Sequence, residues 1–403
     1  GDWIAALSAH FGNRSFYESV GDHLWRIGLV TDPPRLGIQL ETKPYIAVLQ
    51  AVAFLLCLYL FFASIELMSA AFKMSGRGLA EQLLNTASDP LAGLLIGFLA
   101  TSMIQSSSTT TTIVVGLVAS GALTIELAVP IIMGANIGTT TTNTIVAIGH
   151  VTRPAEFERA FAASTVHDFF NLLAAFTILP IEVFFHPVQK SAVFLQSTFA
   201  GAGGMKLASP LKVVIRPLAD FVTGLVPSTL PLMIIALLLL FIALRGMMKI
   251  MQGAVLSRLE GLFDRVLFRN DAASFTLGVV ATASVQSSSA TTSLIVPLAG
   301  TGVLSLRQVF PYTLGANIGT TITAILASFA TGSPAAVTVA LAHLSFNIFA
   351  IVIYYPLKAL PLWMATKWGR IAAQSKGNTA GVFAVYIAAH VIPLMYILWS
   401  ARR

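Results

Sequence analysis

A polar tract set within apolar sequence occurs twice and constrains this chain more than any other feature. Residues 105–112 read Gln-Ser-Ser-Ser-Thr-Thr-Thr-Thr, and residues 286–293 read Gln-Ser-Ser-Ser-Ala-Thr-Thr-Ser. A second shared block, Gly-Ala-Asn-Ile-Gly-Thr-Thr, covers 134–140 and 315–321, so both blocks repeat at a spacing of 181 residues. Hydroxyl and amide groups placed twice in register indicate a binding site built from two related halves.

The composition places these blocks in a membrane. Of the 403 residues, 56% are hydrophobic and 10% are charged, with a mean hydropathy of +0.81, whereas soluble domains carry about 25% charged residues. Apolar runs of roughly 20 residues favour helices over a barrel. The net charge of +7 comes from loops beside the spans, which does not indicate nucleic-acid binding. The single Cys57 excludes an intrachain disulfide.

The first half of the chain is predicted to contain a hairpin and an interrupted span. The apolar stretches on the two sides of the first polar tract are each too short to cross a bilayer, which needs roughly 20 residues. Residues 90–123 are therefore predicted to form a re-entrant hairpin, whose polar tip must be surrounded by protein or water. Asn136 and Gly138 lie midway along 127–148 and indicate a broken helix. The other elements predicted here are an amphipathic arm at 1–43, spans at 45–67 and 156–184, and a surface helix at 73–89.

The second half repeats this order after a connector at 187–229. Its predicted elements are a span at 230–250, a surface helix at 253–270, a hairpin at 271–304, a broken helix at 308–330 and a span at 335–356, with a connector and final span at 359–403 (span 379–400). Three crossings separate equivalent elements, so the halves 44–186 and 230–358 should have opposite orientations. The predicted fold class is an all-α integral membrane protein with two inverted-topology repeats, each holding a re-entrant helical hairpin and a broken transmembrane helix.

Basic residues predict the orientation. The side that carries residues 1–43 also receives eight Lys and Arg residues, and such an excess is typical of the cytoplasmic side. We therefore expect a multi-pass protein of the cell (plasma or inner) membrane with a cytoplasmic N-terminus. The eight residues are Arg245, Lys249, Arg258, Arg265, Arg269, Lys358, Lys367 and Arg370.

The chemistry of the two blocks predicts sites for an anion and a cation. At each tip a half-helix begins with free backbone N–H groups and the positive end of its dipole, which suit an oxyanion. Unwound carbonyls around Asn136 and Asn317, with Thr139 and Thr320, are hard oxygen ligands for a small cation. Apart from Arg307 at a span entrance, the hairpins and broken helices hold no Lys or Arg. Burying an uncompensated anion costs several kcal/mol, so a co-bound cation would give a reason for coupled transport.

Longer strings around the blocks carry a resemblance to a known family. Residues 129–139 read Val-Pro-Ile-Ile-Met-Gly-Ala-Asn-Ile-Gly-Thr, and 142–147 read Thr-Asn-Thr-Ile-Val-Ala. Residues 157–162 read Phe-Glu-Arg-Ala-Phe-Ala, and 165–171 read Thr-Val-His-Asp-Phe-Phe-Asn. With the paired Gln-Ser-Ser-Ser motifs, the chain resembles the type II sodium-dependent phosphate cotransporters over roughly 45–400, as a compact bacterial-type member. The resemblance implies sodium-coupled symport of inorganic phosphate by a transporter that is not an enzyme.

The candidate site residues follow from the tip chemistry and from this resemblance, which implies that Gln286, Ser287, Thr320 and Thr323 match positions that hold a sodium in the family. The predicted phosphate-binding residues are Ser106, Ser107, Ser108, Thr109, Ser287, Ser288, Ser289, Asn136 and Asn317. The predicted sodium-binding residues are Gln105, Gln286, Ser287, Thr139, Thr140, Thr142, Thr320, Thr321 and Thr323. The predicted supporting residues are His167, Asn171, His343 and Asn347. Two departures from the family stand out: Ala135 and Ala316 replace a frequent Ser, and the connector is short and lacks cysteine.

Several of these residues have a structural alternative. Ser and Thr in membrane helices often bond to the preceding turn. Asn136 and Asn317 could be interhelical hydrogen-bond partners, and the two histidines could bond a neighbouring carbonyl. Asp168 has no counterpart, because Leu344 holds the matching place. An intramembrane carboxylate suggests a function, but Asp168 could instead pair with Arg159 or His167.

The function also has alternatives. The same scaffold could carry another oxyanion or a small carboxylate, or use protons in place of sodium. An intramembrane hydrolase would need one motif serine as the nucleophile and one histidine as an oriented base. The occurrence of the serine run in both halves, without a Gly-x-Ser-x-Gly turn, argues against the hydrolase. A channel is disfavoured because tips that meet suggest occlusion.

Overall fold

A computed structural model describes residues 44–74, 89–201, 204–251 and 270–400. These residues form helices and no strand, and six of the helices are long and apolar enough to cross a membrane. The six are Val48–Met74, Pro154–Phe185, Thr229–Ile250, Leu306–Thr331, Pro334–Tyr354 and Lys376–Trp399. The protein is therefore an all-α membrane protein. The arm expected at 1–43, and nearly all of the surface helices expected at 73–89 and 253–270, lie outside the described residues.

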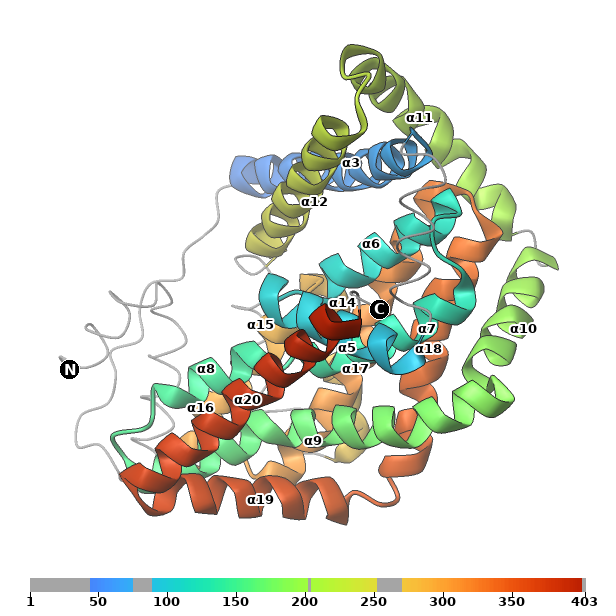
Figure 1. The fold of residues 1–403 in the computed structure, drawn as a ribbon. Helices are drawn as coiled ribbons and strands as arrows, with labels where there is room; N and C mark the ends of the chain where they lie inside the picture. The colour runs from blue at the N-terminus through green and yellow to red at the C-terminus, as the bar shows by residue number, and fades with distance from the viewer. Residues whose placement is uncertain (1–43, 75–88, 202–203, 252–269, 401–403) are drawn as a thin grey trace.

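The helices follow one another in an order that repeats between the two halves (Figure 1). Their bounds are α3 Pro44–Met74, α5 Pro90–Ile104, α6 Ser107–Ser120, α7 Ile125–Gly138, α8 Thr141–Ile148, α9 Pro154–Phe185, α10 Pro187–Gly201, α11 Gly204–Leu225, α12 Thr229–Met251, α14 Asp271–Val285, α15 Ser288–Ser293, α16 Ile295–Gly300, α17 Leu306–Thr331, α18 Pro334–Tyr354, α19 Ala359–Gln374 and α20 Lys376–Ser400.

The first half has the expected helix pair and the expected interruption. Helices α5 and α6 are separated only by Gln105 and Ser106, and α6 ends at Ser120, just before Gly121, which has a φ of 79°. Helix α7 ends at Gly138, and α8 begins at Thr141. Between them the hydroxyl of Thr141 donates to Gly138 O. Side-chain hydroxyls that bond helix carbonyls compete with the backbone ladder, so a run of four threonines favours an interruption here.

The second half corrects one expectation, since α17 runs without a break from Leu306 to Thr331, where a broken helix was expected at 308–330. Ile322 stands where the first half has Thr141, so one competing hydroxyl is lost. The interruption lies instead in the hairpin, between α15 and α16 at Leu294. Pro297 has no N–H to donate to the carbonyl of Ser293, and its ring crowds that carbonyl. Differences in local residues therefore favour a break in the hairpin of the second half and a break after α7 in the first half.

Glycines let each hairpin pack closely on the helix that follows it. A Cβ on Gly97 of α5 would clash with Ile131 O of α7, and one on Gly278 of α14 would clash with Tyr312 O of α17. These glycines occupy matching positions at the 181-residue spacing. Because the obstacle is backbone in each case, no side-chain movement can relieve it. The paired helices α5–α7 and α14–α17 are therefore built on the same contact.

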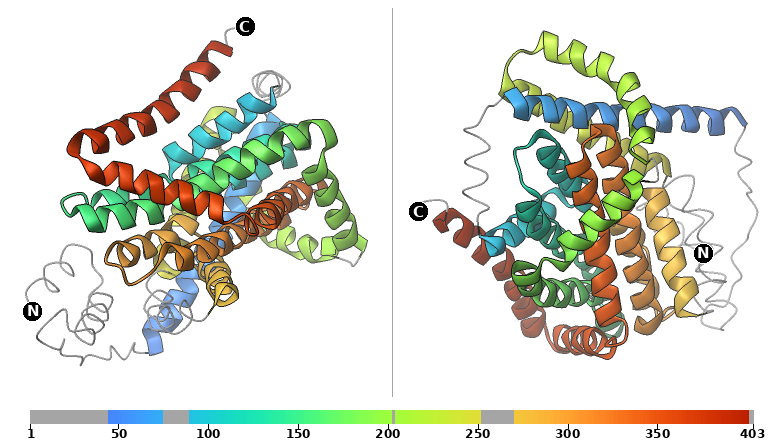
Figure 2. Two further views of the ribbon diagram at one scale, coloured as in Figure 1. Left: turned by 90° about the horizontal axis from the view of Figure 1, so that it is seen from below. Right: turned by 90° about the vertical axis from the view of Figure 1, so that its right-hand side faces the viewer.

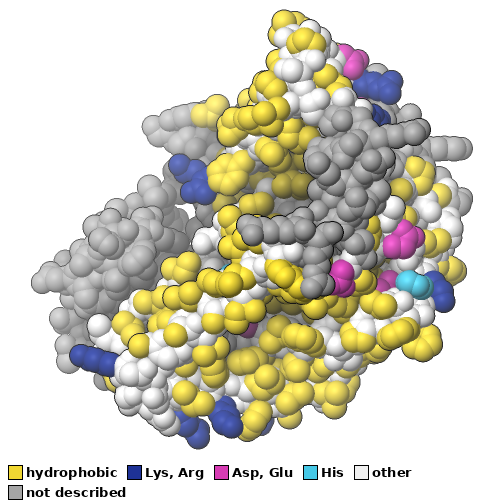
Figure 3. All heavy atoms as spheres, viewed as in Figure 1, with side chains coloured by type: hydrophobic (Ala, Val, Ile, Leu, Met, Phe, Trp, Pro, Cys, Tyr) yellow, Lys and Arg dark blue, Asp and Glu magenta, His cyan; other side chains and the backbone are white. Residues whose placement is uncertain are grey.

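The remaining long helices flank these pairs. Helix α3 lies beside α12, and α9 lies beside α19 (Figure 1). Figure 2 shows α3 crossing one side of the molecule and α20 at the periphery. Among the side chains coloured by type in Figure 3, hydrophobic ones predominate, and the Lys and Arg lie mostly toward the edges of the view. Such a surface suits a protein surrounded by lipid, whereas the polar tracts lie inside the bundle.

Candidate functional site

Both polar tracts form the same turn. Gln105 and Gln286 adopt the left-handed conformation, with φ of 56° and 60°, and each donates its backbone N–H to the carbonyl four residues earlier. The Oγ atoms of Ser106 and Ser287 each accept a hydrogen bond, 3.2 Å long, from the backbone N–H three residues later. A non-glycine residue at positive φ costs on the order of 1 kcal/mol or more. The surrounding structure must therefore hold this turn in both halves.

The structure brings the two tips into contact. Ser108 Oγ donates to Gln286 O at 3.2 Å, across 178 residues of chain. Ser289 Oγ donates to Thr139 O, in the interruption between α7 and α8, at 3.1 Å. Both serines are buried, as are Ser107 and Ser288. Hydroxyls and first-turn N–H groups from the two hairpins are thus gathered with the broken helix in one buried region, and the N-terminus of the 14-residue α6 opens into it.

A further tie in this region was not found from the sequence. Asn143 of α8 and Thr292 of α15 exchange hydrogen bonds, from Nδ2 to Oγ1 at 3.0 Å and from Oγ1 to Oδ1 at 3.1 Å. Both residues are buried. The available signal was an Asn between two threonines in the string at 142–147, where the second half has Ala324 in the matching place. Asn143 therefore holds the second hairpin on the broken helix of the first half.

The residues expected to hold sodium divide into two groups. Thr323 Oγ1 donates to Gln286 Oε1 at 3.0 Å, so these two side chains lie together, with Ser287 next in the chain. Thr320 is one turn earlier on α17 and bonds back to Ala316 O. In the described part of the chain, no three His, Cys, Asp or Glu residues cluster as metal ligands. The oxygens available at this tip are therefore neutral, which suits a hard alkali cation better than a transition metal.

The other expected sodium ligands have less convergent surroundings. Thr139, Thr140 and Thr321 all direct their hydroxyls to carbonyls of their own helical segments, at 2.7–3.1 Å. Gln105 is exposed, unlike its half-buried counterpart Gln286. The hydroxyl contacts match the alternative in which a threonine bonds to the preceding turn, although each oxygen keeps a lone pair.

The motif asparagines pair with histidines rather than with the serines of the tips. His167 Nε2 lies 2.6 Å from Asn317 Oδ1, and His343 Nε2 lies 3.4 Å from Asn136 Oδ1. Each pair joins a histidine of one half to the asparagine of the other, and all four side chains are at most 2% exposed. Asn136 and Asn317 therefore make the interhelical hydrogen bonds given above as the structural alternative, and their partners are the predicted supporting residues His167 and His343.

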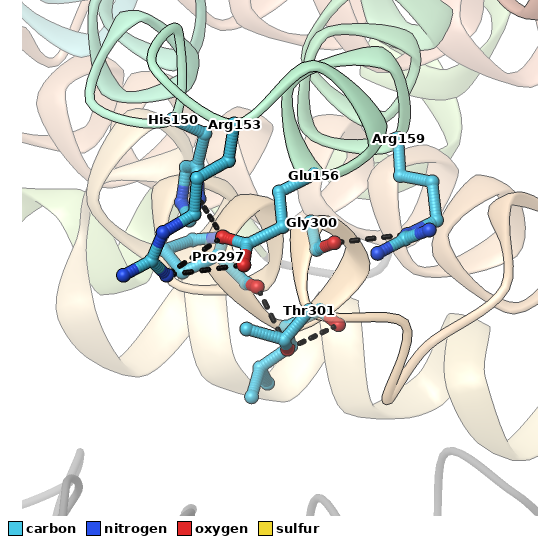
Figure 4. A network of polar contacts seen from close by, with 8 residues as sticks. His150, Arg153, Glu156, Arg159, Pro297, Gly300 and Thr301 are labelled. Atoms are coloured by element: carbon cyan, nitrogen blue, oxygen red, sulfur yellow. Dashed lines mark hydrogen bonds and ion pairs between the residues drawn. The ribbon is translucent and has the colours of Figure 1, made fainter.

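A group of polar contacts lies around the start of α9 and the end of α16 (Figure 4). Arg159 Nε donates to Gly300 O at 2.9 Å and so fixes the end of α16 on α9. Glu156 accepts from Arg153 at 3.0 Å and lies 3.1 Å from His150 Nδ1. Within the described residues, Asp168 forms no ion pair with either expected partner: Arg159 Nε donates to Gly300 O, and His167 Nε2 bonds Asn317.

Comparison with known proteins gives consistent matches. A family model described as Na⁺/Pi-cotransporter matches residues 60–211 and 239–363. The sodium-dependent phosphate transport protein 2B of Pongo abelii is 32% identical over 93% of this chain and 69% of its own length. The human protein of the same name is 33% identical over 84% of this chain and 63% of its own length. The sodium-dependent phosphate transport protein 2A of Ovis aries is 31% identical over 85% of this chain and 68% of its own length. No solved structure matches.

Proposed function

Because the chain belongs to the Na⁺/Pi-cotransporter family, we propose that it is a secondary active transporter that couples the entry of sodium to the uptake of inorganic phosphate by alternating access. Its relatives are named sodium-dependent phosphate transport proteins, and the chain spans about two thirds of their length. Phosphate and sodium are its substrates, and the bilayer is its environment. The contact between the two tips, Ser108 Oγ to Gln286 O, is the observation that carries this proposal.

The fold proposed for this function is a pair of inverted-topology repeats, 44–186 and 230–358, joined by a connector at 187–229. The shared turns at Gln105 and Gln286, and the shared glycine contacts of Gly97 and Gly278, support a duplicated unit. With α7 and α8 crossing as one interrupted span, three crossings separate the hairpins α5–α6 and α14–α16, an odd number that reverses the second. Each hairpin is then re-entrant, with its polar tip inside the membrane.

The phosphate site of this proposal lies between the two tips. The hydroxyls and first-turn N–H groups of the serine runs donate to the phosphate oxygens, with Asn136 and Asn317 behind them. The positive end of α6 favours an anion, while α15 has only six residues and contributes less. The proposed contacts are Ser106, Ser107, Ser108, Thr109, Ser287, Ser288 and Ser289.

Sodium supplies the positive charge that the side chains at the tips lack. No Lys or Arg lies within either tip sequence, so dipoles alone would have to balance a buried anion, at a cost of several kcal/mol. Gln286, Ser287, Thr320 and Thr323 form the proposed principal sodium site, supported by the contact of Thr323 with Gln286. The matching positions of the first half are Gln105, Ser106, Thr139 and Thr142, to which Thr140 and Thr321 add oxygens. Each ion is then poorly held without the other, which is the physical basis of coupling.

The contacts of the histidines favour a transporter over a hydrolase. A serine hydrolase needs an imidazole nitrogen within hydrogen-bond reach of the nucleophile. Here the Nε2 atoms of His167 and His343 both face asparagine oxygens. The Nε2 atom of neither histidine is thus available to act as a base on a serine of either tip. The buried hydroxyls of the two tips are therefore better suited to binding an ion than to nucleophilic attack.

The protein is proposed to lie in the plasma or inner membrane with its N-terminal arm on the cytoplasmic side. The basic residues at the end of α12 and those between α18 and α19 and on α19 support this orientation by the excess of positive charge. The described members of that set are Arg245, Lys249, Lys358, Lys367 and Arg370.

Uptake of radiolabelled phosphate into proteoliposomes tests the function. We expect uptake to require an inward sodium gradient and to fall to background when choline replaces sodium on both sides. Uptake that continues undiminished in choline would discard sodium coupling. Transport of sulfate or a dicarboxylate in preference to phosphate, measured as competition in the same vesicles, would assign a different anion to the tips.

A further inference from the structure

A chain of hydrogen bonds crosses the interior from one half to the other. His167 Nε2 bonds Asn317 Oδ1 at 2.6 Å, and Asn317 Nδ2 donates to Asn171 Oδ1 at 2.8 Å. Asn171 Nδ2 then donates to Asn136 O, again at 2.8 Å. The side chains of His167, Asn317 and Asn171 are at most 1% exposed, so water does not compete for these bonds.

The chain can run in only one direction. Each amide accepts through its oxygen and donates through its nitrogen, and both amides are oriented by the bonds they make. Because Asn317 Oδ1 can only accept, His167 must carry a proton on Nε2. Its Nδ1 is buried and has no hydrogen-bond partner among the described residues, which fits a neutral ring with a bare Nδ1. His167 is therefore the donor that starts the chain.

The far end of the chain lies at the interruption of α7 and α8. The backbone partner of Asn136 O is Thr139 N, three residues later and at a long 3.4 Å, in place of the N–H four residues later that a regular helix would supply. Asn171 adds a shorter bond to the same carbonyl. The same interruption frees Thr139 O, which accepts from Ser289 of the second hairpin. The position of Ser289 is thus linked, through a few residues of backbone, to the bond that Asn171 makes.

We propose that His167 is a positioning residue which, through Asn317 and Asn171, holds the interruption of the first half in the geometry that docks the second hairpin. This inference rests on the proposed phosphate site, to which Ser289 belongs. His167 touches neither substrate. It fixes the orientation of two amides, and they fix the carbonyl of Asn136.

The second half offers a natural comparison, because its equivalent residues do not form such a chain. Asn347 matches Asn171, but its Nδ2 donates to His343 O within α18, and its Oδ1 has no partner among the described residues. The reason is that α17 is continuous, so the carbonyl of Asn317 stays within the helix. His343 lies 3.4 Å from Asn136 Oδ1, a weaker contact than that of His167.

Transport assays of matched variants test the proposal. His167→Met and Asn171→Leu remove the chain without changing volume greatly, and we expect each to raise the phosphate concentration for half-maximal uptake about tenfold, with the maximal rate within about twofold. His167→Gln can place an amide N–H where Nε2 donates, and it should restore most of the loss. Asn347→Leu should raise the same concentration less than about threefold. Equal effects of Asn171→Leu and Asn347→Leu would overturn the proposal.

A double substitution and an exchange measurement separate positioning from direct binding. If His167 acts only through the chain, His167→Met combined with Asn171→Leu should be no worse than either alone, whereas multiplied losses would contradict it. Hydrogen–deuterium exchange in detergent should be faster at 136–143 in His167→Met than in wild type, and this readout needs no transport. Wild-type protein that fails to take up phosphate would reject the proposed function alone, while unchanged exchange in a folded His167→Met would reject the positioning role alone.

Discussion

The part of the first half that runs from its hairpin to its last span (residues 90–185) and the same part of the second half (residues 271–354) share their turns but differ in where a helix is broken. Both place a glutamine at positive φ before a capping serine, and both end the hairpin at a glycine with φ near 80°, 79° at Gly121 and 84° at Gly302. Yet the first half keeps α6 whole and breaks the next span between α7 and α8, whereas the second breaks the hairpin arm at Leu294 and keeps α17 whole.

This difference shows which features the duplication holds fixed. Pro297 stands where the first half has Gly116, and Ile322 stands where it has Thr141, and each difference favours the observed position of the break. The consequence is an asymmetric site: Ser289 docks on the broken helix of the first half, while its counterpart Ser108 docks on the turn at Gln286. The tips are copies, but their surroundings are not.

The largest effect should come from substitutions at the shared glycine contact. Gly97→Val and Gly278→Val each place a side chain against backbone oxygens of α7 and α17. Overpacking typically costs about 1–3 kcal/mol of folding free energy, and a backbone neighbour cannot move aside to reduce that cost, so we expect both variants to lose the monodisperse peak in fluorescence-detected gel filtration. Gly121→Ala is the control, since nothing lies within 4 Å and only the strain of about 1 kcal/mol at positive φ applies. If only one of the two variants lost the monodisperse peak, the glycine contacts of the two halves would not be equivalent.

The next effect separates the two proposed sodium positions. Thr323 bonds Gln286, whereas the matching Thr142 forms no side-chain hydrogen bond among the described residues. We expect Thr323→Val to raise the half-activating sodium concentration about tenfold, because it removes a proposed sodium ligand and the hydrogen-bond partner of Gln286. Thr142→Val should raise it less than about threefold. The measurement is phosphate uptake against sodium concentration, and equal shifts would mean that both halves hold sodium alike.

A smaller effect tests the cause of the break in the second hairpin. Pro297→Ala restores an N–H that can donate to Ser293 O, so α15 and α16 should join. The free energy of unfolding should rise by about 1 kcal/mol. This is less than the roughly 3 kcal/mol by which proline is disfavoured inside a helix, because neighbouring residues constrain α15 and α16. Slower hydrogen–deuterium exchange at 293–301 would accompany it. Exchange that stays at the wild-type rate would mean that packing, and not Pro297, holds the break.

Much of the fold follows from the sequence because its determinants are local. Apolar runs and their lengths predict α3, α9, α12 and the hairpin at Gln105, and the family assignment made from the motifs is confirmed by the family model and the relatives. The unbroken α17 was predicted wrongly, because the motif around Asn317 is the same in both halves. Whether it breaks depends on Ile322 and on packing, which a motif comparison does not weigh.

The candidate site was harder to predict, because its contacts join residues far apart in the chain. The tips and their hydroxyls are evident from the motifs, and their roles in binding remain proposals. The pairing of His167 with Asn317 spans 150 residues, and that of Asn143 with Thr292 spans 149. The sequence of one half gives no sign that its histidine contacts a residue of the other half. The structure shows that the histidine of each half forms a hydrogen bond with the motif asparagine of the other half.

The smallest effect concerns the ion pair at the end of the last span of the second half, and the matching position of the first half gives the comparison. Lys358, in the second, bonds Asp271 at 2.7 Å at the surface, whereas Glu182, at the matching place in the first, is buried and accepts from the backbone of Val188 and Gln189. An exposed ion pair contributes less than about 1 kcal/mol, so Asp271→Asn should lower the melting temperature slightly. Glu182→Ala leaves two N–H groups unpaired and should cost about 1–3 kcal/mol.

The pH dependence distinguishes this ion pair from a packing effect. The hydrogen bond from Lys358 lowers the pKa of Asp271, so the charged carboxylate stabilises the folded state above the unfolded pKa of about 3.9. That contribution is lost as the pH falls through the lowered pKa. The difference in melting temperature between wild type and Asp271→Asn should therefore be full at pH 7 and should shrink below about pH 4. A difference in melting temperature that stays constant down to pH 3 would mean that the Asp271 side chain acts through packing and not through its charge.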